Sequence, residues 1–171
     1  KEDRRFSDWK KNFHQFLRVW TLQGLWVFLT SVAAVTAITS RKIIEPDLFL
    51  YIGSFLWVFG FLFESIADYQ KRKFRSENKN KFIQSGLWSL SRHPNYFGEI
   101  VLWFGIALIA FPTLVGPQYV SLISPLFVYL LLTRVSGVHI LEKHADDTWG
   151  KKKDYKAYKE KTPVLFPKIF K

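Results

Sequence analysis

The chain of 171 residues contains no cysteine and no methionine. Without cysteine it can form neither a disulfide nor a thiolate metal site. A chain that begins at Lys1 without an initiator methionine is expected to be a processed product or a fragment, with any targeting segment or further N-terminal helices upstream of it.

Several motifs that carry chemistry in soluble enzymes are missing as well. The sequence has no G-x-G-x-x-G, no G-x-x-x-x-G-K and no G-x-S-x-G, which excludes a Rossmann module, a P-loop and a nucleophile elbow. The four histidines show no H-E-x-x-H spacing, so we expect no metal site. Any nucleotide would have to be held by helices and loops.

What the chain does have is long apolar runs, separated by basic connectors. Hydrophobic residues make up 49% and aromatic residues 18% of the composition. Runs of about 20 apolar residues are long enough to cross a bilayer. We therefore predict an all-α, multi-pass transmembrane bundle forming a single membrane domain over residues 1–171, with about four spans plus interfacial amphipathic helices. The spans are expected at 21–39, 48–67, 96–111 and 118–137.

The segment before the first span, residues 1–20, is charged but carries an aromatic and aliphatic stripe. Its apolar residues recur at three- and four-residue steps, as in a helix lying in the membrane interface. The plainer interpretation, which we prefer, is a connector between membrane spans. The stripe consists of Phe6, Trp9, Phe13, Phe16, Leu17 and Trp20.

The basic residues indicate an orientation. All but Arg41 and Lys42 of the 25 Lys and Arg residues fall on the side shared by both termini and the loop 69–95. The positive-inside rule makes that side cytosolic, or the matrix or stromal side in an organelle. Because these charges flank spans, we expect the bilayer and not nucleic acid as the partner, with lysines 151–153 near anionic headgroups.

A polar motif stands directly before the third span, in residues 89–105, S-L-S-R-H-P-N-Y-F-G-E-I-V-L-W-F-G. Pro94 favours the first turn of a helix, which leaves the residues before it in the lead-in. Asn95 and Glu99 then share one helical face, and Gly98 and Gly105 leave room for close approach to the backbone. We interpret the motif as a binding site, the alternative being a helix cap with interfacial anchors. Its polar residues are Arg92, His93, Asn95, Tyr96 and Glu99.

A second polar row closes the second span. Glu64, Asp68, Arg72 and Arg75 follow at steps of four, four and three, so the helix is expected to continue past the membrane surface with these side chains on one face. An acid at Glu64 should face protein or a water-filled cavity. The alternative is a set of weak ion pairs on a solvated helix end. A basic, aromatic-rich cluster at the membrane edge suits an anionic cofactor such as a dinucleotide phosphate.

The stretch S-G-L-W-S-L-S-R-H-P-N-Y-F-G-E-I resembles the C-terminal region of the steroid 5-alpha-reductase superfamily, particularly a widespread branch of unknown function. The likeness extends to D-R-R-F, Q-G-L-W-V-F, R-V-S-G-V-H-I-L-E-K and D-Y-K-A-Y-K-E-K-T-P-V-L-F-P, and so covers nearly the whole chain. The core R-H-P-x-Y-x-G alone also resembles isoprenylcysteine carboxyl methyltransferases, which use S-adenosylmethionine. Asn95 and Glu99 favour the reductases.

The resemblance implies a membrane reductase in which NADPH occupies a cytosol-facing cavity and reduces a carbon–carbon double bond of a lipid or steroid-like substrate. Asn95 would match the cofactor-contacting asparagine, and Glu99 the acid one turn later. Asp68 and Arg75 would match the acid and arginine of the preceding helix, with Arg72 as a helper, whereas Glu64 stands where a neutral amide is expected. The expected cofactor-binding set is Asp68, Arg72, Arg75, Arg92, His93, Asn95, Tyr96, Glu99 and Tyr158.

The family's N-terminal helices, which largely carry the substrate-polarising residues, have no counterpart in the chain. Three hypotheses follow: an NADPH-dependent reductase or the cofactor-binding part of one, a non-catalytic subunit among partner membrane subunits, and an S-adenosylmethionine-dependent lipid methyltransferase.

Overall fold

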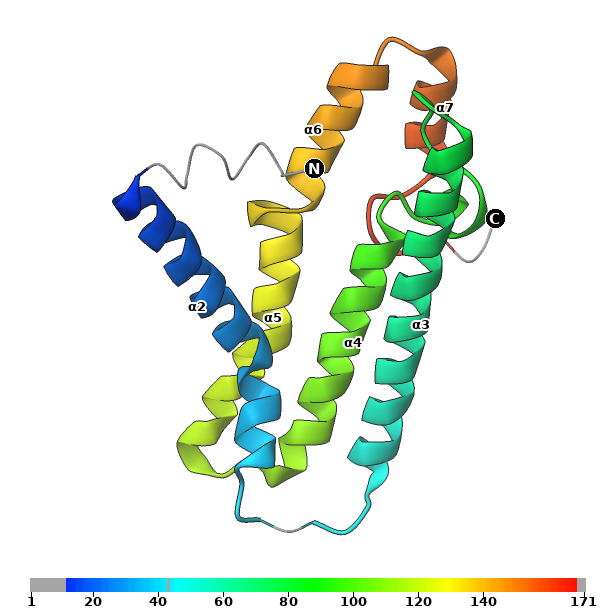
Figure 1. Cartoon of the computed structure of the whole chain (residues 1–171). Helices are drawn as coiled ribbons and strands as arrows, with labels where there is room; N and C mark the ends of the chain where they lie inside the picture. Colours follow the sequence, from blue (N-terminus) through cyan, green and yellow to red (C-terminus); the bar gives the residue numbers. More distant parts are fainter. Residues whose placement is uncertain (1–11, 43, 169–171) are drawn as a thin grey trace.

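A computed structural model describes residues 12–42 and 44–168, and within these ranges the protein is helical with no strand (Figure 1). Four helical segments are long and apolar enough to span a membrane: Phe13–Ile38, Leu48–Glu77, Pro94–Thr113 and Gly116–Trp149. The predicted all-α multi-pass bundle is confirmed. Its helices are α2 (Phe13–Ile38), α3 (Leu48–Glu77), α4 (Pro94–Ala110), α5 (Ile123–Leu130), α6 (Val138–Trp149) and α7 (Lys153–Lys161).

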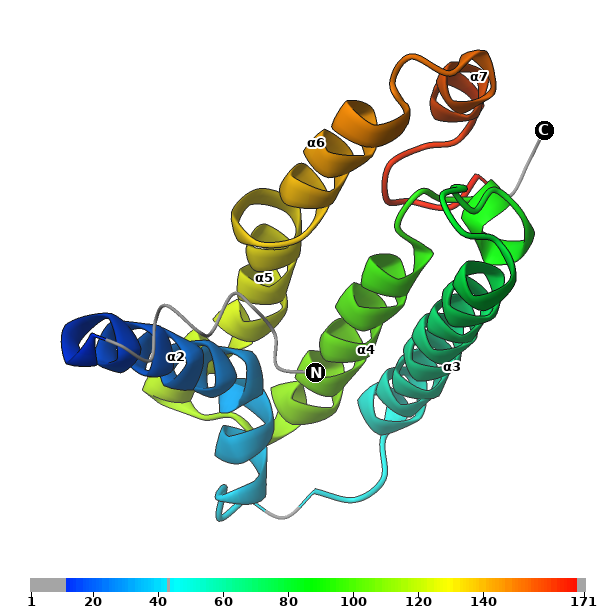
Figure 2. The ribbon, with the colours of Figure 1, turned by 45° about the horizontal axis from the view of Figure 1, so that its top comes forward.

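Helices α3 and α4 lie side by side, with α5 on the other side of α4 (Figure 2). Four glycines bring the α3 and α4 backbones together. A Cβ atom added at Gly60 would lie 2.5 Å from the Gly98 carbonyl oxygen, and one at Gly53 would lie 2.7 Å from that of Gly105. Small residues allow such contact between membrane helices. The room that the sequence predicted beside Gly98 and Gly105 is thus filled by α3 and not by a ligand.

Helix α2 is capped by Asn12, whose side chain accepts a hydrogen bond from the His14 amide at 3.0 Å. It packs on α4 and α5, and Ser124 of α5 donates a hydrogen bond to the Thr30 carbonyl. The predicted separation of an interfacial segment from a span starting at residue 21 is wrong for residues 13–20, since they belong to the same continuous helix. The rest of that segment, residues 1–11, lies outside the described residues.

The fourth span, predicted over 118–137, lies within the apolar segment Gly116–Trp149, and that segment is not one uninterrupted helix. It opens with a 3-10 turn (Gly116–Leu122), continues as α5, loosens into a π-helical turn (Leu131–Val135) and breaks at Ser136 and Gly137 before α6. Gly137 adopts φ −105° and ψ −101°, and the Tyr96 ring lies against it, since a Cβ there would be 2.9 Å from that ring. The break redirects the chain into α6.

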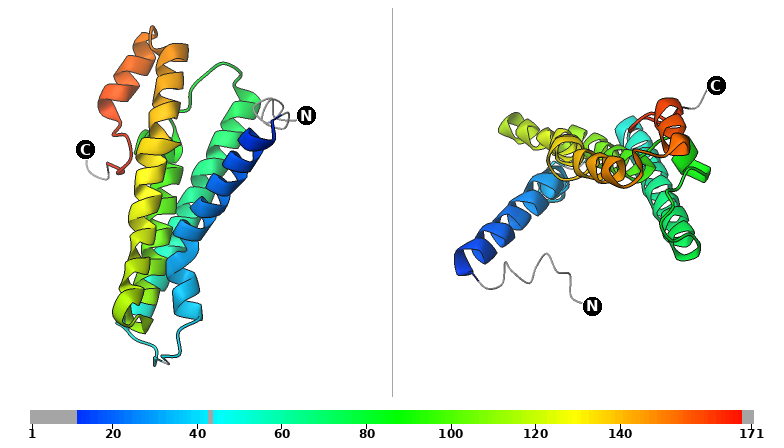
Figure 3. Two further views of the ribbon diagram at one scale, coloured as in Figure 1. Left: turned by 90° about the vertical axis from the view of Figure 1, so that its left-hand side faces the viewer. Right: turned by 90° about the horizontal axis from the view of Figure 1, so that it is seen from above.

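The polar elements gather at one end of the bundle (Figure 3). The end of α3, the loop to α4, α6, α7 and the C-terminal segment 162–168 all lie there. Helix α3 continues to Glu77, as predicted, and the tail contains α7, which the sequence interpretation treated only as a basic segment. The candidate site residues therefore lie at the polar end of the bundle.

Candidate functional site

A groove follows the polar end of α3. It has a volume of about 490 Å³, and we call it the α3 groove. The α-helical spacing that the sequence predicted places the acid and the arginines of the row on this one surface, so Asp68, Arg72 and Arg75 are brought together. The groove is lined by Phe61, Glu64, Ser65, Asp68, Lys71, Arg72 and Arg75.

The motif forms the start of α4 as predicted. His93 precedes the helix and Pro94 occupies its first turn. The Tyr96 ring stacks on the His93 ring at 5.7 Å and 8°. The Asn95 Oδ1 atom is buried and has no hydrogen-bond partner among the described residues. Because a Cβ at Gly98 would lie 2.6 Å from the Glu64 amide nitrogen, the start of α4 sits close to the acidic stretch of α3.

The loop between α3 and α4 is anchored on α3. Gln70 Oε1 accepts a hydrogen bond from the Leu87 amide at 2.9 Å, and the Trp88 indole donates to the Ala67 carbonyl at 2.9 Å. Gly86 makes this possible because its φ of 62° is disfavoured for other residues. The Lys71 ammonium lies 4.4 Å from the centre of the Trp88 ring, a cation–π contact.

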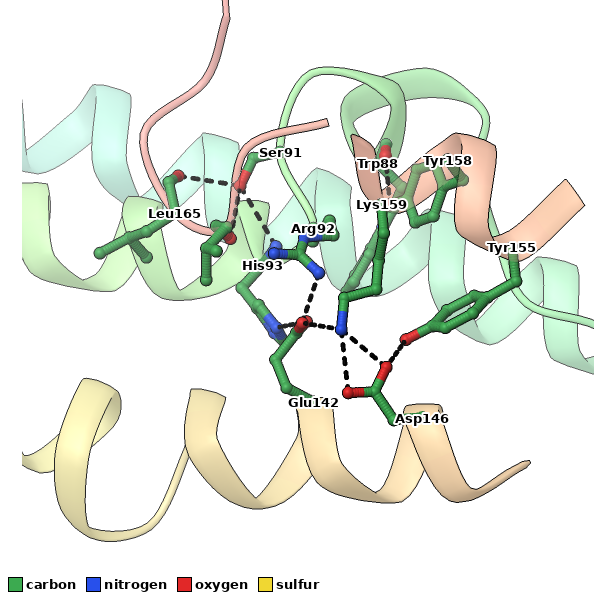
Figure 4. Close-up of polar contacts among 11 residues, drawn as sticks. Trp88, Ser91, Arg92, His93, Glu142, Asp146, Tyr155, Tyr158, Lys159 and Leu165 are labelled. Atoms are coloured by element: carbon green, nitrogen blue, oxygen red, sulfur yellow. Dashed lines mark hydrogen bonds and ion pairs between the residues drawn. The ribbon is translucent and has the colours of Figure 1, made fainter. Parts of the chain in front are cut away.

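A network of ion pairs, the clasp, joins the motif to α6 and α7 (Figure 4). Glu142 on α6 accepts one hydrogen bond from Arg92 and one from His93 Nε2, the latter at 2.8 Å. The side chains of Arg92 and His93 are 11% and 6% exposed, so their pairing with Glu142 is shielded from water.

The clasp continues onto α7, where it becomes more exposed. Lys159 donates to both carboxylate oxygens of Asp146, at 2.7 and 2.9 Å, and its ammonium lies 3.7 Å from Glu142. Tyr155 donates to Asp146 at 3.0 Å. One charged network therefore holds two C-terminal helices on the start of α4.

The C-terminal segment pairs with the lead-in of the motif. The Arg92 amide donates to the Pro163 carbonyl and the Lys168 amide to the Leu90 carbonyl, each at 2.9 Å. Ser91, which is fully buried, donates to the Leu165 carbonyl at 2.8 Å. Burial of these polar groups is thus matched by hydrogen bonds.

A second, smaller hollow of about 130 Å³ lies between the end of α3, the following loop, α6 and α7. We call it the aromatic hollow. Lys71 and Arg75 line both this hollow and the α3 groove, so the two share a wall. Its aromatic lining residues are Phe74, Phe82, Trp88, Trp149, Tyr155 and Tyr158.

Two tyrosines of α7 act as hydrogen-bond donors in this region. Tyr158 donates to the Trp88 carbonyl at 2.7 Å, and burial raises the pKa of its phenol above the ordinary value. Burial and the hydrogen bond to Asp146 raise the pKa of Tyr155 in the same direction. Both hydroxyls therefore keep their protons at neutral pH.

The predicted set divides into three groups. Asp68, Arg72 and Arg75 line the α3 groove, Arg75 also lines the aromatic hollow with Arg92, His93 and Tyr158, and neither lining includes Asn95, Tyr96 or Glu99. Tyr96 instead stacks on His93 and supports the break at Gly137.

Sequence reasoning gave no role to Glu142, Asp146, Lys159 or Lys71. Glu142 contacts Arg92, Lys159 contacts Asp146 and Lys71 contacts Trp88, each across more than 10 residues of sequence, and no local spacing marks these pairs. The one available signal was the run R-V-S-G-V-H-I-L-E-K, which contains Glu142.

A family model for a protein of unknown function, DUF1295, matches residues 1–162, and the chain belongs to this family. Searches of curated proteins and of solved structures returned no match.

Proposed function

We propose that the protein is an NADPH-dependent reductase of a carbon–carbon double bond in a lipid or steroid-like substrate, or the cofactor-binding part of one. The observation that carries the proposal is the α3 groove, in which two acids and three cations line one surface at the polar end of a membrane bundle. The resemblance of the motif to the steroid 5-alpha-reductase superfamily supports it.

The donor set fits the cofactor. Arg72 and Arg75 offer forked donors suited to phosphate oxygens, and the Asp68 carboxylate can accept hydrogen bonds from ribose hydroxyls. Asn95 lies outside both linings, so its role as a partner of the nicotinamide carboxamide is supported by the resemblance alone. When bound, NADPH supplies a hydride, and the chain's task is to bind and orient it.

The membrane setting supports a lipid as the class of substrate. Helix α3 carries the groove residues on the same helix as its lipid-facing apolar side chains, so a substrate dissolved in the bilayer can reach the polar end by moving along the helix. We assign no proton donor.

The test is ligand binding to the purified chain in detergent, with NADPH, NADH and S-adenosylmethionine compared by thermal stabilisation. We expect NADPH to stabilise the chain and Arg72→Gln to weaken that binding about tenfold, since a charge-assisted contact contributes about 1.4 kcal/mol or more. Lys73→Gln is the matched control, because Lys73 lies next to Arg72 on α3 but outside both hollows.

The other hypotheses have distinct outcomes. Stabilisation by S-adenosylmethionine alone would indicate a lipid methyltransferase. No response to any of the three would favour a non-catalytic subunit of a membrane complex. Binding of NADPH without its consumption in vesicles containing an α,β-unsaturated ketone lipid would identify the chain as the cofactor-binding part only.

A further inference from the structure

A third hollow, of about 470 Å³, lies where α7 ends and the C-terminal segment pairs with the lead-in of the motif. We call it the C-terminal hollow. It has no lining residue in common with the α3 groove and shares Arg92 with the aromatic hollow. Its charged lining residues are Arg92, Lys159, Glu160, Lys161 and Lys168, and its exposed apolar ones are Val164 and Phe166.

Two lysines of this hollow are left over by the clasp. Arg92 is paired with Glu142, and Lys159 with Asp146. Lys161 and Lys168 are exposed, and no carboxylate of residues 12–42 and 44–168 lies within 4.0 Å of their ammonium groups. Even when Glu160 and both clasp carboxylates are counted, the cations of this part of the chain outnumber the acids. The hollow therefore favours an anionic ligand.

The hollow lies at the level where α4 enters the membrane. The spanning segment Pro94–Thr113 has 20 residues. As a helix it is about 30 Å long, which matches the hydrocarbon thickness of a bilayer, so its first turns lie at the membrane boundary. Figures 1 and 2 show the C-terminal segment beside the start of α4. There the Phe166 ring packs edge-on against the Phe97 ring, with 6.1 Å between centres, and stays 64% exposed.

Cations beside exposed apolar side chains match a ligand that has both characters. Basic pockets at the membrane surface bind anionic headgroups, and long lysine side chains can reach the headgroup level. A soluble anion would leave Val164 and Phe166 uncovered, whereas the acyl chains of a lipid would cover them. The combination favours a phospholipid over a soluble phosphate.

We propose that the C-terminal hollow binds an anionic phospholipid, with its phosphate beside Lys161 and Lys168 and an acyl chain against Phe166. Bound there, the lipid holds the C-terminal segment on the lead-in of the motif, next to the clasp. The inference does not depend on the proposed function, because neither lysine lines the α3 groove or the aromatic hollow.

The test uses the full chain in detergent and measures thermal stabilisation and, by native mass spectrometry, the lipid that stays bound. Dioleoylphosphatidylglycerol is the anionic probe, dioleoylphosphatidylcholine the zwitterionic comparator and glycerol 3-phosphate the soluble phosphate. We expect phosphatidylglycerol to be retained and to stabilise the chain, phosphatidylcholine to bind about tenfold more weakly, and glycerol 3-phosphate to give no stabilisation. Replacing both lysines, as Lys161→Gln with Lys168→Gln, should weaken phosphatidylglycerol about fivefold for each lysine removed.

Lys151→Gln with Lys152→Gln is the matched control. It removes the same charge from exposed positions at the polar end but outside the hollow. General attraction to an anionic micelle would make both pairs of substitutions equally harmful, whereas a defined site is affected by the first pair alone. Phe166→Leu keeps an apolar side chain and should retain the lipid, and Phe166→Ser should weaken it.

Three results would overturn the inference. Equal losses in the two lysine pairs would mean general surface attraction, and equal retention of phosphatidylcholine would mean nonspecific lipid around the spans. Binding of glycerol 3-phosphate as tight as that of the lipid, and dependent on Lys161 and Lys168, would identify a site for a soluble phosphate instead. Any effect of NADPH should be unchanged by the Lys161 and Lys168 substitutions, which keeps this test separate from that of the proposed function.

Discussion

The apolar part and the polar end of the helix bundle are held together by different interactions. In the apolar part, α3 and α4 meet backbone to backbone at four glycines. At the polar end, α6, α7 and the C-terminal segment are held on the start of α4 by the clasp and by hydrogen bonds to the motif.

The difference follows from the solvent at each end. In lipid there is no hydrophobic driving force between apolar side chains of neighbouring helices, so membrane helices are held together largely by close packing of small residues. At the polar end, water screens charges, and an ion pair contributes substantially only where side chains are shielded. The glycine contacts thus leave no room for an added atom. The clasp, in contrast, is shielded from water at Arg92 and exposed to water at Lys159.

The largest effect is expected from adding one methyl group between α3 and α4. Gly60→Ala places its Cβ 2.5 Å from the Gly98 carbonyl oxygen, and because backbone cannot rotate away, the helices must separate. We expect a loss of about 3 kcal/mol in the free energy of unfolding, the upper range for overpacking. Titration with a denaturing detergent, followed by tryptophan fluorescence, measures it.

Gly24→Ala is the matched control for this substitution. Gly24 lies inside α2, and a Cβ there would meet nothing within 4 Å. Alanine is the better helix former, so this variant should be unchanged or up to about 1 kcal/mol more stable. Equal losses in the two variants would show that the α3–α4 contact has no special role.

A smaller loss is expected from breaking the shielded part of the clasp. Glu142→Gln keeps the shape of the side chain but leaves the Arg92 guanidinium, 11% exposed, without its counter-charge. Because Glu142 itself is 20% exposed, we expect about 2 kcal/mol, below the range for a fully buried pair. Detergent titration again measures it, and cleavage by trypsin within α7 should become faster.

Glu160→Gln on α7 removes the same charge from an exposed position and should leave stability and cleavage unchanged. Comparable behaviour of the two glutamate variants would mean that the clasp does not hold α6 and α7 in place.

The same contrast explains which features the sequence could predict. Apolar runs and helical spacing depend on neighbours within one or two turns, so the four spans, the extension of α3 and the shared face of Asp68, Arg72 and Arg75 could be predicted. Pro94 likewise marked the start of α4 correctly. Each of these predictions needed only local geometry.

The clasp could not be predicted in this way. Glu142 meets Arg92 across 50 residues, and the break at Gly137 that turns α6 toward the motif lies in a run that reads as continuous and apolar. For the glycine contacts, the sequence predicted a close approach to the backbone at Gly98, but it did not predict that α3 is the element that approaches. Contacts between residues far apart in the sequence can be identified only once the fold is known.

The smallest effect is expected at the exposed edge of the clasp. The side chains of Lys159 and Asp146 are 32% and 47% exposed, so their ion pair is surrounded by water and ions. Lys159→Met keeps the apolar stem and removes the charge, and we expect a loss of about 0.5 kcal/mol. The loss should shrink further when the titration is repeated at about 1 M salt, where the Debye length is about 3 Å, whereas the loss caused by Glu142→Gln should persist. If salt reduced both losses equally, the clasp would be equally exposed along its length, and the distinction between its shielded and its exposed parts would fail.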